Sequence, residues 1–198
     1  MAEIDATITE GIAEAINDPL LQGLSGLARG WIHLARGNFD RAIGVLQGVR
    51  VLGQDLHQRH FIDIYIALAL LSQGKICAAA LQFRESLLLA AEVLNYRGMA
   101  GSIEGCGYLC ATLGFFADAV RYLEVARRIR ERTHVPLFSF WLPHHRAAEV
   151  LLRQSLTDAE YSTQRLAGGA MREEDAANEV LERLQAFATV DEKKPLGS

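Results

Sequence analysis

Three short segments of the chain repeat the same succession of residues at nearly equal steps. Each segment has a glycine, a turn of two or three residues and, five positions after the glycine, an alanine. The glycines are Gly37, Gly74 and Gly114, at steps of 37 and 40 residues. Glycine readily ends a helix, and a period near 40 residues with such helix ends is typical of stacked helical hairpins. The segments therefore predict an all-α chain whose hairpins bury their apolar faces against one another.

Residue size also repeats around the three glycines. A small residue stands seven positions before and five positions after each glycine, and a bulky apolar residue stands nine positions after it: Gly30, Ala67 and Gly107; Ala42, Ala79 and Ala119; Leu46, Phe83 and Leu123. Small residues let the two helices of a hairpin cross closely, and we expect the bulky residues to fill the space between hairpins. The pattern predicts a right-handed superhelix of antiparallel helix hairpins.

The chain divides into helices without a low-complexity linker, so we expect one domain over residues 1–188. About four hairpins are predicted near 19–55, 57–95, 98–132 and 140–167, with capping helices at 4–17 and 172–187 and a flexible tail at 189–198. Isoleucines at positions 4, 8, 12 and 16 form an apolar stripe on the first helix. This stripe either caps the first hairpin or forms the seam of a homodimer.

Composition limits the classes of function. With 198 residues, half of them apolar and only four prolines, the chain is long enough for a sizeable core and is not a disordered chain. The 20 basic and 24 acidic residues give a net charge of −4, which lacks the basic excess expected of a dedicated nucleic-acid binder. The N-terminus lacks a secretion signal, and no apolar run approaches the roughly 20 residues that span a bilayer. We expect a cytoplasmic protein with three reduced cysteines and no membrane segment.

At the repeated small and bulky positions the chain resembles the tetratricopeptide family, with hairpins slightly longer than usual. Five further segments are similar to the C-terminal repeat region of large bacterial LuxR-type and maltose-regulator-like ATPase transcriptional regulators: 122–130, 135–137, 145–147, 156–161 and 169–176. The resemblance covers roughly residues 20–185 and implies a tetratricopeptide-like α-solenoid that senses an inducer or docks a partner protein. Unlike those regulators, the chain has no phosphate-binding loop and no room for a DNA-binding domain.

In such a stack the first helix of each hairpin lines the concave side. We therefore expect an apolar and aromatic groove with one carboxylate and one histidine, suited to a peptide, a protein segment or a small effector. The candidate residues are Trp31, Phe61, Leu68, Glu104, Tyr108, Trp141 and His144, and the same wall includes Leu24, Leu27 and Ile64. The alternative interpretation places Trp31, Phe61 and Leu68 in the core, between hairpins or under the terminal helices.

Other clusters give weaker indications. Five arginines between positions 121 and 132 would suit an acidic partner or a phosphate, but the interspersed glutamates favour a solvated convex face. His57, His60, His144 and His145 do not combine with Cys106 and Cys110 into the four-ligand pattern of structural zinc, so we expect no metal and no cofactor. No nucleophile elbow or other catalytic motif occurs, so no catalytic residue is expected.

The sequence thus predicts a non-enzymatic interaction or effector-sensing module, in transcriptional regulation or signalling, that works by binding in its concave groove. The alternative is a homo-oligomeric assembly scaffold or a chaperone-like adaptor that uses another surface. Two further hypotheses are an enzyme with convergent titratable groups in the groove and a nucleic-acid binder that uses the arginine-rich helix.

Overall fold

The computed structural model describes residues 19–51, 56–137 and 139–189. In these ranges the chain forms helices and no strand, which confirms the predicted all-α class. The elements are α2 (Pro19–Ala35), α3 (Phe39–Val51), α4 (Leu56–Ser72), α5 (Ile76–Glu92), α6 (Tyr96–Thr112), α7 (Phe116–Thr133), the short 3-10 helix η1 (Ser139–Trp141), α8 (Leu142–Ser155), α9 (Asp158–Ala170) and α10 (Glu173–Phe187). The predicted helix 4–17, with its choice between cap and dimer seam, and the tail beyond residue 189 lie outside the described residues.

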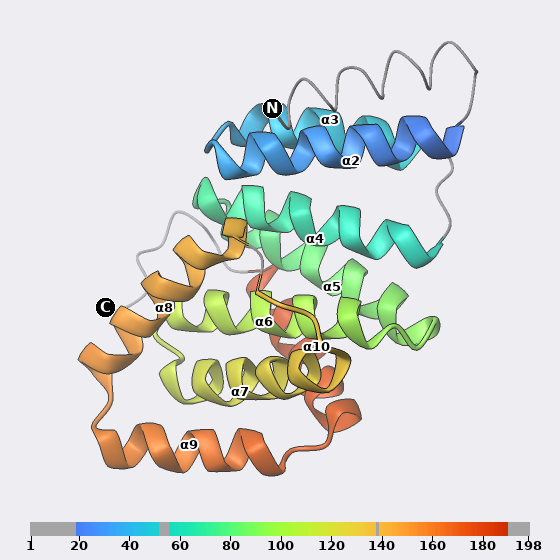
Figure 1. Ribbon diagram of the computed structural model, residues 1–198. Coiled ribbons are helices and arrows are strands. Elements are labelled where there is room, and N and C mark those ends of the chain that lie inside the picture. The colour runs from blue at the N-terminus through green and yellow to red at the C-terminus, as the bar shows by residue number, and fades with distance from the viewer. Residues whose placement is uncertain (1–18, 52–55, 138, 190–198) are drawn as a thin grey trace.

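The first six of these helices pack as three consecutive pairs. α2 packs on α3, α4 on α5 and α6 on α7, and the pairs meet where α3 contacts α4 and α5 contacts α6. The first helices of the pairs also touch in order, α2 against α4 and α4 against α6. Figure 1 shows the pairs one below another, from the blue α2 and α3 to the yellow-green α6 and α7.

The turns that separate the helices of each pair contain the repeated glycines. Gly37, Gly74 and Gly114 have φ angles of 73°, 73° and 83°, so each adopts the left-handed conformation that commonly ends a helix, at the positions where the sequence predicted helix ends. The ends of α5 and α7 use the same conformation without glycine, because Leu94 and His134 have φ angles of 50° and 54°. These two ends carry no glycine signal in the sequence.

The repeated small and bulky residues pack in two different ways. A Cβ atom placed on Gly30 would lie 2.6 Å from Leu46, and one on Gly107 would lie 2.9 Å from Leu123. These two leucines therefore contact small residues of their own pair. Phe83 follows the prediction, since its ring lies against Gly105 in the next pair. A larger residue at any of these glycines would push the helices apart.

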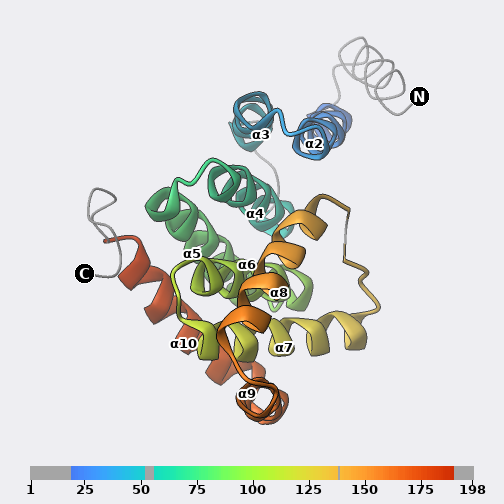
Figure 2. The same cartoon turned by 90° about the vertical axis from the view of Figure 1, so that its left-hand side faces the viewer.

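The region predicted as a fourth hairpin, 140–167, is packed differently from the first three pairs. α8 packs chiefly on α6 and η1, whereas α9 packs chiefly on α7, and the two helices touch only slightly. Figure 2 shows α8 crossing in front of α6. Buried Trp141 explains this path, because its ring lies 3.6 Å from the Cβ position of Gly101 on α6 and draws the start of α8 there.

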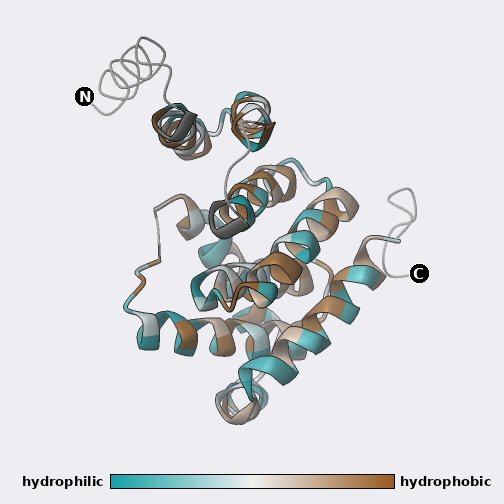
Figure 3. Ribbon diagram, turned by 90° about the vertical axis from the view of Figure 1, so that its right-hand side faces the viewer, coloured by the Kyte–Doolittle hydropathy of each residue, from teal (hydrophilic) through white to brown (hydrophobic). Residues whose placement is uncertain are grey.

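The last helix, predicted as a cap at 172–187, reaches back across the molecule. α10 contacts α5, α6 and α7 through a buried stripe made of Ala176, Ala177, Val180, Leu184 and Phe187. In Figure 3 the helix beside the C-terminal label alternates brown and teal along its length, as expected for one apolar and one solvated face. α10 therefore covers a side of two helix pairs instead of closing the end of the last one.

Candidate functional site

A cavity of about 300 Å³ lies among α2, α4 and α6 and is bounded on another side by α7 and the segment that follows it. The lining consists of Leu24, Leu27 and Trp31 from α2; Phe61, Ile64 and Tyr65 from α4; Arg97, Ala100, Gly101 and Glu104 from α6; Arg130 from α7; and Val135, Pro136, Leu137 and Trp141. Three helices that are separated in sequence thus contribute to one partly open cavity, together with the connection between α7 and α8.

Aromatic rings form much of the wall. The ring of Trp31 meets that of Tyr65 edge-on at 5.6 Å between centroids and is stacked on that of Phe140 at 6.4 Å. Trp141, on another side of the cavity, is 5.9 Å from Tyr108. The chain contains two tryptophans, and both line this cavity. Trp31 is 39 % exposed whereas Trp141 is buried, so one tryptophan lies toward solvent and the other lies deep.

A buried carboxylate is the main polar feature of the cavity. Glu104 is 2 % exposed; its Oε2 atom pairs with the guanidinium of Arg130, and its Oε1 atom accepts a hydrogen bond of 2.9 Å from the Tyr108 hydroxyl. His145 Nδ1 lies 3.9 Å from Oε1. Burial raises the pKa of Glu104, and the charge of Arg130 and the hydrogen bond from Tyr108 work against that rise. The carboxylate is thus held in place by helices α6 and α7 together.

Arg97 supplies the other charged group of the lining. It is the second residue of α6 and is exposed, and in the described ranges it contacts no carboxylate. The nearby Arg132, in contrast, pairs with Glu173 at 2.6 Å and covers the ring of Tyr96. The cavity therefore combines one charge-neutral buried pair with one uncompensated positive charge.

The structure brings four of the seven candidate residues to the cavity wall, namely Trp31, Phe61, Glu104 and Trp141. Tyr108 stands behind the wall, where it supports Glu104. His144 is one layer further out: its ring stacks on Tyr108 at 5.9 Å and its Nε2 atom lies 2.9 Å from Ser72 Oγ, and burial lowers its pKa. Leu68 is a core residue, 2 % exposed, and does not line the cavity.

Sequence reasoning missed Tyr65, Arg97, Ala100, Gly101, Arg130 and the segment 135–137. One of these had a detectable signal: Gly101 stands 40 residues after Phe61, the same step that separates Gly74 from Gly114. Arg97 lies one helical turn before Gly101 and so shares its face. Residues 135–137 follow the third pair and have no repeat position from which to infer them.

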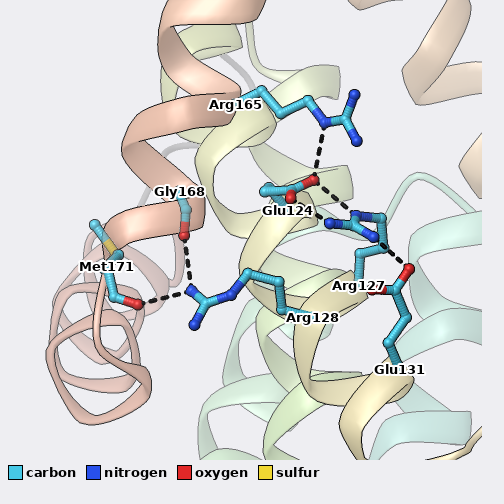
Figure 4. A network of polar contacts seen from close by, with 7 residues as sticks. All are labelled: Glu124, Arg127, Arg128, Glu131, Arg165, Gly168 and Met171. Atoms are coloured by element: carbon cyan, nitrogen blue, oxygen red, sulfur yellow. Dashed lines mark hydrogen bonds and ion pairs between the residues drawn. The ribbon is translucent and has the colours of Figure 1, made fainter.

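Ion pairs and hydrogen bonds connect the arginine-rich helix α7 to its neighbours. Arg127 pairs with Glu124 and Glu131, and Glu124 also receives Arg165 of α9 at 3.2 Å, as Figure 4 shows. Arg128 donates to the carbonyl oxygens of Gly168 and Met171 at 3.2 and 3.0 Å. The remaining arginines of the cluster pair with carboxylates of other helices: Arg121 with Glu179, Arg130 with Glu104 and Arg132 with Glu173. The interpretation of this cluster as a simply solvated face was wrong, because much of it holds helices together.

The cysteines and histidines whose side chains the structure describes do not assemble into a larger cluster. In the described ranges, no three side chains of histidine, cysteine, aspartate or glutamate are placed to hold a metal ion. Cys106 and Cys110 are fully buried on α6, and burial raises the pKa of the Cys106 thiol. These thiols are core side chains.

Comparison with known proteins returned no match to any protein-family model, curated protein or solved structure. Across the described ranges, every helix is too short or too polar to cross a lipid bilayer.

Proposed function

We propose that the protein is a non-enzymatic effector-binding module and that the cavity among α2, α4 and α6 is its ligand site. One observation carries the proposal: a partly open, largely apolar cavity of about 300 Å³ contains one buried carboxylate whose charge is already balanced. Apolar concave sites with a few fixed polar groups are the usual places where proteins bind small molecules.

Binding is favoured over catalysis by the composition of the wall. The described lining contains no serine, threonine, cysteine, histidine or lysine, so it offers few nucleophiles or proton carriers. Glu104 is engaged by Arg130 and Tyr108, an arrangement that suits a structural anchor better than a proton-transferring base.

The finer description of the fold is part of the same proposal. We infer a tetratricopeptide-like right-handed superhelix over residues 19–133, in a single domain, because three helix pairs follow one another with left-handed glycines at equivalent turns. The resemblance to the sensor regions of LuxR-type regulators suggests a role in transcriptional regulation or signalling in the cytoplasm. α8 and the segment before it would then pass the signal on, since residues 135–137 and Trp141 line the cavity.

The test uses the two tryptophans as reporters. N-phenyl-1-naphthylamine, a neutral apolar fluorophore, should bind the full-length protein and quench emission from Trp31 and Trp141 by energy transfer. The variant Ala100→Leu adds volume to the wall and should weaken this binding at least tenfold. The matched control is Ala117→Leu, which makes the same change at an exposed position of α7 and should bind the probe as the unchanged protein does.

The cavity assignment fails if the unchanged protein does not bind the probe, or if Ala100→Leu binds it with unchanged affinity. Ile64→Phe, which fills the space from α4, gives a second variant in case Ala100→Leu does not fold. Circular dichroism at 222 nm verifies the helical fold of each variant.

A further inference from the structure

The charges on the cavity wall do not cancel. Glu104 and Arg130 pair with each other, which leaves Arg97 as the remaining side chain of the described lining with a full charge. Tyr65 is the other titratable group there, and burial raises the pKa of its phenol, so it stays neutral. Burial also raises the pKa of Glu104, and protonation of that carboxyl would remove its negative charge and make the wall more positive.

Arg97 is placed to meet an anion. It lies in the first turn of α6, whose end is capped by the Asn95 side chain accepting from the Gly98 amide at 3.1 Å. The first turn of a helix has partial positive charge from the aligned peptide dipoles, and this adds to the charge of the guanidinium. No carboxylate of the described residues occupies this position, whereas Arg130 and Arg132 each have one.

The size and polarity of the remaining wall limit the rest of the ligand. A volume of about 300 Å³ is at the lower end of the range for small-molecule sites and is small for an amphipathic helix. Apart from the three ionisable groups and the Tyr65 hydroxyl, the lining is made of aliphatic and aromatic side chains with Ala100 and Gly101. The space therefore suits a compact apolar body.

We propose that the ligand is a small amphipathic acid, with an apolar body among the rings of Trp31, Phe61 and Trp141 and a carboxylate that pairs with Arg97. The inference rests on the proposed function of the cavity. A guanidinium binds a carboxylate through two parallel hydrogen bonds, and such charge-assisted bonds are among the strongest that a partly exposed site can form.

Three probes of one chain length test the charge preference: decanoate, 1-decanol and decylammonium. Each is titrated against the full-length protein in competition with N-phenyl-1-naphthylamine, below the concentration at which it forms micelles. Decanoate should bind about tenfold or more tightly than 1-decanol, and decylammonium should bind most weakly. Added salt should reduce the advantage of decanoate, since the guanidinium is exposed.

The variant Arg97→Gln tests whether the preference for decanoate depends on Arg97. This variant should bind decanoate and 1-decanol within about twofold of each other, with 1-decanol unchanged from the natural sequence. The matched control is Arg41→Gln, which removes the same charge from an exposed arginine of α3 that does not line the cavity. It should retain the full preference for decanoate.

The outcomes separate the two proposals. If the fluorophore itself does not bind, so that no probe can displace it, the proposed function fails. If 1-decanol or decylammonium binds as well as decanoate, or if Arg97→Gln keeps the preference, the cavity remains a binding site but the inference of an acidic ligand is overturned.

Discussion

Arg130 on α7 neutralises Glu104 on α6, and the pair connects the two helices beside the cavity. The carboxylate is almost fully buried, and the guanidinium is 14 % exposed. Removing two charges from water is costly, so the pair is expected to contribute more to the arrangement of the site than to stability. The same burial makes the pair sensitive to the loss of one partner.

Replacing Arg130 alone should destabilise the protein strongly. Arg130→Met keeps most of the apolar stem but leaves the Glu104 carboxylate buried with only the Tyr108 hydroxyl and the distant His145 nearby. We expect a loss of about 3–5 kcal/mol in the free energy of unfolding. Urea denaturation followed by circular dichroism measures it. The double variant Glu104→Gln with Arg130→Met should recover most of the loss, and a double variant as unstable as the single one contradicts this account.

A second buried carboxylate, Asp63 on α4, predicts a dependence of stability on pH. Its side chain is fully buried; Arg50 Nη1 lies 3.4 Å away, and neither carboxylate oxygen accepts a hydrogen bond within the described residues. Burial raises the pKa from 3.8 to about 6 although Arg50 lowers it; Glu85 adds to the rise and Arg59 opposes it. The folded protein therefore binds this proton more tightly than the unfolded chain does.

Because the unfolded chain releases the proton of Asp63 first, stability should fall as the pH rises from about 4 to about 6. Asp63→Asn cannot titrate, so comparing it with the natural sequence isolates this effect. Relative to Asp63→Asn, the free energy of unfolding of the natural sequence should decrease by about 2 kcal/mol between pH 4 and pH 7. Urea denaturation at several pH values measures the difference. A change in the opposite direction would mean that Arg50 outweighs burial.

Two adjacent glycines of α9 provide a matched pair of substitutions. A Cβ atom on Gly168 would lie 2.5 Å from the carbonyl oxygen of Arg121 and 2.9 Å from its Cα atom, whereas one on Gly169 would meet nothing within 4 Å. Gly168→Ala should therefore separate α9 from α7 and cost about 1–3 kcal/mol. Gly169→Ala should be neutral or stabilise by up to about 1 kcal/mol, because alanine favours the helix. Thermal unfolding compares them, and equal effects would contradict the close approach of the two backbones.

Arg128 is expected to hold the C-terminal end of α9. Its guanidinium donates to the carbonyl oxygens of Gly168 and Met171, among the last carbonyls of this helix end, where acceptors lack a full set of helical partners. Arg128→Met keeps the aliphatic stem, and it should cost about 1–2 kcal/mol and speed hydrogen exchange in α9. Arg127→Met is the control, because Glu124 would keep Arg165 and the end of α9 would be unchanged. Equal exchange in the two variants would show that Arg128 does not cap this end.

The helices and their order follow from local signals. The predicted bounds 57–95 and 98–132 lie within three residues of the outer ends of α4 with α5 and of α6 with α7, and Gly74 and Gly114 end helices in the way that their backbone freedom favours. The ends at Leu94 and His134 carried no such signal, because neither residue is a glycine; backbone hydrogen bonds from the next amide to Ala90 and Arg130 close these ends. The paths of α8 and α10 were not predicted either, since repeat periodicity stops where these helices begin.

Apart from Trp141, the part of the site that was predicted follows the repeat. Trp31, Phe61 and Glu104 lie on first helices of the three pairs, where the spacing places them on one wall. Leu68 shares that spacing, but its side chain is buried in the core. Residues within one turn of a helix point in different directions, so a small difference in position separates a wall residue from a core residue. Arg130 belongs to a second helix and reaches the cavity by the length of its side chain, which no periodic pattern encodes.

The wall of the cavity takes residues from all three helix pairs: α2 belongs to the first pair, α4 to the second, and α6 with α7 form the third. A molecule held there would touch both ends of the described stack at once, whereas α2 otherwise meets the later elements chiefly through α4 and η1. A bound ligand would thus connect the first pair to the third. Amide hydrogen exchange in α2 and α3 should become slower when the ligand binds, and the melting temperature of the protein should rise.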